Sequence, residues 1–106
     1  MSEVRNYVVF VTAPNEADAA RIGRTLVEER LAACANIAGQ IRSIYWWQDA
    51  IEDKAECLMV LKTSHASLDA LIDRANELHS YEVPEIIALP IHHGYPPYLD
   101  WIAENA

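Results

Sequence analysis

The chain has 106 residues, 52% hydrophobic and 23% charged, which is enough apolar sequence for one packed domain and too short for two. Its net charge of −8 argues against nucleic-acid binding, because a phosphate backbone requires positive patches, and against binding to an anionic membrane. The sequence has no apolar stretch of about 18 residues and no secretory pattern at its start, so we expect a cytoplasmic protein.

The first predicted elements are a strand and an amphipathic helix. Tyr7 to Val11 is a continuous apolar, β-branched run, which is typical of a buried strand. Asn15 is a favourable N-cap, and a helix from there to about 30–33 would present a single apolar stripe. That stripe consists of Ala19, Ile22, Gly23, Leu26 and Val27.

A long β-hairpin is predicted next. Cys34 to Trp47 forms a strand candidate with large apolar side chains on both faces, and Gly39 marks a bulge or bend within it. We expect the polar residues Asp49 to Asp53 to form the turn. Ala55 to Thr63 is then the returning strand.

The last part of the chain predicts a helix, a strand and a short terminal helix. Ser64 or Ser67 can cap the second helix, and Glu85 to Ile91 follows as the fourth strand. Pro96-Pro97 opens a terminal helix over Tyr98 to Glu104, where proline suits the first turn. The apolar stripe of the second helix is Leu68, Leu71, Ile72, Ala75 and Leu78.

The predicted order is that of a single domain over residues 1–106, an α+β ferredoxin-like βαββαβ sandwich with a long hairpin between its second and third strands and a short C-terminal helix. In this fold two helices lie on one face of a four-stranded antiparallel sheet. They cannot cover the other face, and monomers rarely expose large apolar patches. We therefore expect self-association.

The two cysteines are expected to be free thiols packed in the core. In the predicted hairpin Cys57 lies opposite roughly Tyr45, on the order of 30 Å from Cys34. A disulfide requires Cα atoms within about 7 Å of each other.

A series of segments resembles the CutA divalent-cation-tolerance family and covers nearly the whole chain. The resemblance implies a ferredoxin-like protomer in a cytoplasmic homotrimer linked to tolerance of copper and other divalent cations. It also implies a likeness in architecture to the PII signal proteins, and from it an alternative function, the sensing of a small molecule or partner at clefts between subunits. The matching segments are Thr12-Ala13-Pro14, Leu31 to Ile37, Tyr45-Trp46-Trp47, Leu61-Lys62-Thr63, Tyr81 to Ile86 and Tyr98 to Trp101.

The resemblance also implies a copper-ligand pattern, of which this chain keeps one position. One arrangement in the family has a cysteine where this chain has Val11 and a His-His pair where it has Leu78-His79. His79 is therefore the one metal ligand carried over, whereas copper favours thiolate with imidazoles. We expect no required cofactor and, at most, a weakly bound divalent cation. The adjacent His92 and His93 are not expected to share a metal, because neighbouring strand side chains point apart.

A ligand cleft is a second candidate site. Lys62 stands alone in an apolar strand and should pair with a carboxylate or face a cleft, since an unpaired buried ammonium is costly. With Tyr45, Trp47, Tyr81 and Glu85 it would line a polar, aromatic pocket suited to a small molecule. A structural network at an interface explains the same residues equally well. The sequence shows no set of nucleophile, base and orienting residue, so we expect a binding protein and no enzyme.

Overall fold

The structure is a computed structural model that describes residues 4–106. The predicted order of elements is confirmed. The first and third strands extend further than expected, the second has the expected bounds, and the fourth is shorter by one residue at each end. The elements are β1 (Asn6–Ala13), α1 (Glu16–Glu28), β2 (Cys34–Trp47), β3 (Ala50–Ser64), α2 (Leu68–Leu78), β4 (Ile86–Pro90) and α3 (Pro96–Asn105).

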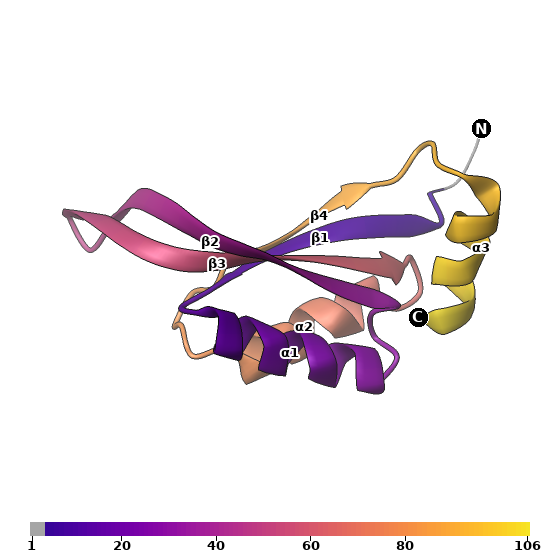
Figure 1. The fold of residues 1–106 in the computed structure, drawn as a ribbon, viewed down its shortest axis with the longest axis horizontal. Coiled ribbons are helices and arrows are strands. Elements are labelled where there is room, and N and C mark those ends of the chain that lie inside the picture. The colour runs from indigo at the N-terminus through magenta and orange to yellow at the C-terminus, as the bar shows by residue number, and fades with distance from the viewer. Residues whose placement is uncertain (1–3) are drawn as a thin grey trace.

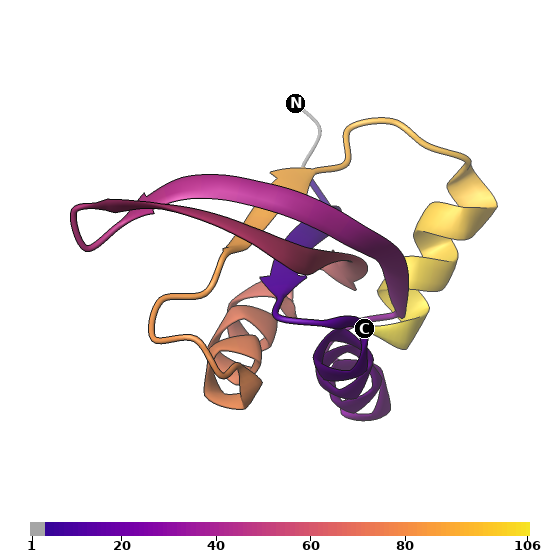
Figure 2. The same ribbon diagram turned by 60° about the vertical axis from the view of Figure 1, so that its left-hand side comes forward.

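The four strands form one antiparallel sheet in the order β2-β3-β1-β4, which is the ferredoxin-like topology. Figure 1 shows α1 and α2 on one face of this sheet and α3 at one end of it. At the opposite end the β2–β3 hairpin continues past the other strands as a curved arm, which is also visible in Figure 2.

The hydrophobic core lies between the sheet and the two helices α1 and α2. Alternate residues of β1 and β3 point into it, and the apolar stripes of the helices meet them. The largest fully buried side chains of this cluster are Val9, Val11, Ile22, Leu26, Met59, Leu61 and Leu71.

The intervening strand residues point to the other side of the sheet, and we call this side the open face. Ile87 and Leu89 on β4 are each 54% exposed there. Helix α3 covers only one end, where Ile102 is fully buried and the Asn6 amide donates to the Leu99 carbonyl oxygen at 2.9 Å. The apolar residues of the open face are Val8, Phe10, Leu58, Val60, Ile87 and Leu89.

The hairpin turns earlier than predicted. Trp47 pairs with Ala50, so the turn is Gln48-Asp49 alone, and residues 50–53, which were expected to form the turn, belong to β3. Gln48 and Asp49 have φ angles of 49° and 64°, both left-handed, as in a two-residue type I′ hairpin. The polar residues after the turn therefore reflect the exposed arm and do not mark a loop.

The earlier turn changes which residues lie opposite the two cysteines in the hairpin. Cys57 lies opposite Gln40, not Tyr45, and Cys34 lies opposite Lys62. Both thiols are free, as predicted. Cys57 is buried in the core, whereas Cys34 is only half-buried. The expectation that both lie in the core is therefore wrong for Cys34, because its strand position directs it to the open face.

Two local signals are confirmed and one helix end is corrected. The Asn15 side chain accepts a hydrogen bond from the Asp18 backbone N–H at 2.8 Å, so it caps α1. The β2 bulge lies between Ile37 and Gly39, and Gly39 has a φ of 112°. Helix α1 ends at Glu28, before the expected 30–33, and the left-handed Arg30 follows it.

The turn geometry gives a test of the hairpin. Asp49→Gly should stabilise the protein by about 1 kcal/mol, because glycine adopts a left-handed conformation without steric cost. Asp49→Val should destabilise it by about 1–2 kcal/mol, because a β-branched residue is strained there. Urea unfolding at one fixed protein concentration measures both. Asp53→Gly, inside β3, is the control and should destabilise the protein. An equal increase in unfolding free energy for both glycine variants would contradict the turn assignment.

Candidate ligand cleft

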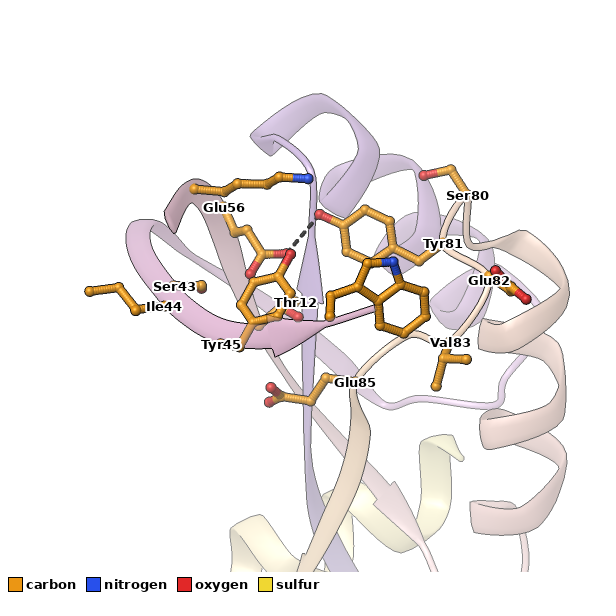
Figure 3. A pocket seen from close by; sticks show the side chains of 12 residues that line it. Thr12, Ser43, Ile44, Tyr45, Glu56, Ser80, Tyr81, Glu82, Val83 and Glu85 are labelled. Carbon is orange, nitrogen blue, oxygen red and sulfur yellow. Dashed lines mark hydrogen bonds between the residues drawn. The ribbon is translucent and has the colours of Figure 1, made fainter. Parts of the chain in front are cut away.

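A cavity of about 640 Å³ lies where the hairpin arm leaves the sheet. Its walls come from the arm, from the end of β1 and from the segment between α2 and β4 (Figure 3). Because β1 ends at Ala13, opposite Cys57, the segment after α2 can reach the arm beyond that point. The lining residues are Thr12, Ser43, Ile44, Tyr45, Trp47, Lys54, Glu56, Ser80, Tyr81, Glu82, Val83 and Glu85.

The most buried charged group of the cleft is Glu56, whose exposed fraction is 5%. The Tyr81 hydroxyl donates to Glu56 Oε2 at 2.7 Å, shown as the dashed line in Figure 3. Burial first, and then the hydrogen bond to and the charge of Glu56, raise the pKa of Tyr81. Tyr81 therefore stays protonated and donates to the carboxylate throughout the physiological pH range.

His79 holds the segment after α2 against β1. Its Nδ1 accepts the Tyr81 backbone N–H at 3.1 Å, and its Nε2 lies 2.7 Å from the Thr12 carbonyl oxygen. A carbonyl oxygen only accepts, so Nε2 carries the proton and the ring is neutral. The imidazole also packs on the Tyr81 ring, with centroids 4.7 Å apart.

This arrangement does not support the expected role of His79 as a metal ligand. The ring is buried and both nitrogens are engaged within the protein, so no lone pair is available for a metal. Residues 4–106 also contain no group of three or more His, Cys, Asp and Glu side chains that could hold a metal ion. His79 is instead a positioning residue for the cleft.

Four of the five residues predicted to form a ligand cleft do come together at this cavity. They arrive from two separate parts of the chain, the β2 arm and the segment after α2, which the topology brings face to face. These four are Tyr45, Trp47, Tyr81 and Glu85.

Lys62, the fifth predicted residue, does not line the cavity. Its ammonium donates to the Asn36 side-chain oxygen and lies 3.9 Å from Cys34 Sγ, on the open face. The lysine that lines the cleft is Lys54, whose Nζ pairs with Glu52 at 3.4 Å. Lys54 lies on the part of β3 that extends past β1, whereas Lys62 lies next to β1.

The sequence patterns did not point to Glu56, although the same kind of signal was present. Glu56 is an acidic residue directly before an apolar strand segment, just as Lys62 is a lone charge near the end of that segment. Only the register of β3 against β1 shows which of the two charges reaches the segment after α2.

The Tyr81–Glu56 bond gives a second prediction. Tyr81→Phe should destabilise the protein by about 1.5–3 kcal/mol, because the carboxylate stays buried without its donor. The contribution of Tyr81 is complete below about pH 10 and falls as pH rises towards its raised folded-state pKa, since the unfolded phenol ionises first. Urea unfolding at neutral and alkaline pH measures this. The difference in unfolding free energy between wild type and variant should be constant below about pH 10 and smaller above it. Tyr95→Phe is the control, as Tyr95 is 73% exposed and should change little.

Comparisons with known proteins give matches over nearly the whole chain. The sequence matches the family described as CutA1 divalent ion tolerance protein over residues 7–105. "Protein CutA" of Mus musculus is 50% identical over 93 residues, which cover 88% of this chain and 52% of the relative, so the chain spans about half the length of that relative. The "Divalent-cation tolerance protein CutA" of Thermus thermophilus is 48% identical over 98 residues, 92% of this chain and 95% of the relative.

Solved structures show the same fold. The structure of the divalent cation tolerance protein from Thermus thermophilus superposes with a TM-score of 0.91 at 47% identity, covering 94% of this chain and 97% of that one. The match in sequence and in fold runs from β1 to α3. The chain belongs to the CutA1 divalent ion tolerance protein family.

Proposed function

We propose that the protein acts in the tolerance of divalent cations as a cytoplasmic homotrimer, and that it works by binding and not by catalysis. The observation that carries the proposal is the family match over residues 7–105. No helix in residues 4–106 is long and apolar enough to cross a membrane.

The open face supports the trimer. Its apolar residues belong to adjacent strands and form a continuous patch of the kind that monomers cover by association. The arm adds Ile44, Trp46 and Ile51, which are 63%, 71% and 60% exposed. By strand register these three lie on the opposite side of the hairpin from the open face, so neighbouring copies on the two sides would bury both surfaces.

The metal chemistry of the chain supports an indirect role in copper tolerance. His79 is engaged within the protein, and the exposed His92 and His93 offer imidazoles without a thiolate beside them. Scattered imidazoles and carboxylates bind copper only loosely. Tolerance would then come from what the protein binds or contacts, with no tight copper site in the chain.

The trimer has a direct test. Light scattering should give a mass near three times 11.9 kDa, about 36 kDa. Ile87→Asp should shift the mass towards that of the monomer, because a charge on the open face would be buried against a neighbouring copy. Val27→Asp, on α1, is the matched control and should remain trimeric, because Val27 is 37% exposed and lies outside the hydrophobic core cluster. A wild-type monomer at micromolar concentration would contradict the proposal.

The role in cation tolerance is tested in cells that lack their own copy of this family. Expression of this chain should raise the copper concentration at which growth stops. Ile87→Asp should remove that gain, and Val27→Asp should keep it. No gain from the wild-type chain would refute the functional proposal.

Copper titration of the purified protein tests whether the effect is indirect. We expect a dissociation constant in the tens of micromolar or weaker, by order of magnitude. His79→Gln should leave that weak affinity unchanged, because its nitrogens already have partners. Stoichiometric submicromolar binding would instead show a direct copper site.

The cleft is the proposed ligand site of this binding protein. It combines a partly open cavity, aromatic walls and a few polar groups, which is the usual composition of a small-molecule pocket.

A further inference from the structure

The charged groups around the cleft are unbalanced. Three carboxylates line it, those of Glu56, Glu82 and Glu85, against the single ammonium of Lys54. That ammonium already pairs with Glu52. The cleft is therefore negative within a chain that is itself acidic, and this repels anionic ligands such as nucleotides.

Glu56 is the most buried of these three carboxylates. It is 95% buried, since its exposed fraction is 5%. Within residues 4–106 its only side-chain hydrogen bond comes from Tyr81 to Oε2, and no cation lies within ion-pair distance of it. A buried carboxylate is costly unless a positive partner balances it. Its other oxygen, Oε1, accepts from no donor in residues 4–106 and is open to solvent in the cavity, since Asn6 Oδ1 is the one fully buried side-chain oxygen there without a partner.

The arrangement of the carboxylates does not suit a metal ion as the positive partner of Glu56. A small ion needs several ligand atoms that converge on one point, and residues 4–106 contain no such group of three. Figure 3 shows Glu82 and Glu85 at separate places around the cleft, away from Glu56. Carboxylates that are spread out match a ligand whose positive charges are spread out as well.

The walls of the cleft favour an organic cation. Tyr45, Trp47 and Tyr81 line it, and Trp47 is 37% exposed, so its ring is open to a ligand. Aromatic faces attract ammonium groups and pack against methylene chains. An extended alkyl chain with an amine at each end fits both the walls and the separated carboxylates.

We propose that the cleft binds an aliphatic polyamine, with one ammonium on Glu56 Oε1, the alkyl chain along the aromatic walls and its further ammonium groups towards Glu82 and Glu85. The proposal rests on the cleft being the ligand site of the protein. It requires neither the trimer nor the role in cation tolerance.

Calorimetric titration of the full chain with spermidine, in about 150 mM salt to screen loose attraction, tests this directly. Glu56→Gln should weaken binding about tenfold or more, because a charge-assisted hydrogen bond is lost while the amide oxygen can still accept from Tyr81. Glu104→Gln removes the same charge from α3, outside the cleft, and should leave the affinity unchanged. Thermal unfolding checks that both variants fold.

Three further measurements keep the test decisive. Glu85→Gln, at an exposed position, should weaken spermidine binding about threefold even if Glu56→Gln fails to fold. Butylamine, with one charge, should bind about tenfold more weakly than spermidine, and Mg²⁺ at the same ionic strength should not displace spermidine.

The proposal is overturned if spermidine does not bind, if Glu104→Gln weakens binding as much as Glu56→Gln, or if Mg²⁺ displaces spermidine. Its failure is distinct from failure of the proposed function. Lost amine binding with an intact trimer and intact copper tolerance refutes only the polyamine site. Intact amine binding without any effect on growth in copper refutes only the role in tolerance.

Discussion

Two helices can cover only one face of a four-stranded sheet, and the rest of the molecule is arranged around that limit. The apolar stripes of α1 and α2 meet the inward residues of β1 and β3, which closes the core on one side. The other side keeps Ile87 and Leu89 exposed, and α3 shields only the end at Asn6. The single chain therefore closes its hydrophobic core but leaves an apolar face of the sheet exposed.

The cleft depends on the same topology at the opposite end of the sheet. Because β1 stops at Ala13, the segment after α2 meets the hairpin arm directly, with no strand between them. His79 fixes that segment to Thr12, and Tyr81 fixes it to Glu56. A residue that resembles a remnant metal ligand in sequence thus serves to position a cavity.

Element order, core and aromatic cleft residues could be predicted from the sequence, because each has a local signal. Apolar periodicity indicated the helices, and the hairpin aromatics indicated Tyr45 and Trp47. The position of the turn was not predictable in the same way, because Gln48-Asp49 lacks the glycine typical of left-handed turns while Asp49 to Asp53 is polar. The assignment of Lys62 to the cleft failed because it depends on register between strands that are far apart in sequence.

The length of the arm has a consequence for local stability. Beyond Gln40 and Cys57 the two hairpin strands pair only with each other, so the arm is a two-stranded ribbon without the support of β1. Backbone amides near Gln48 should exchange with deuterium faster than those of Val9 or Leu61 in the centre of the sheet. One wall of the cleft therefore belongs to the two-stranded part of the sheet, and its opposite wall is anchored through His79 to β1, which is paired on both sides.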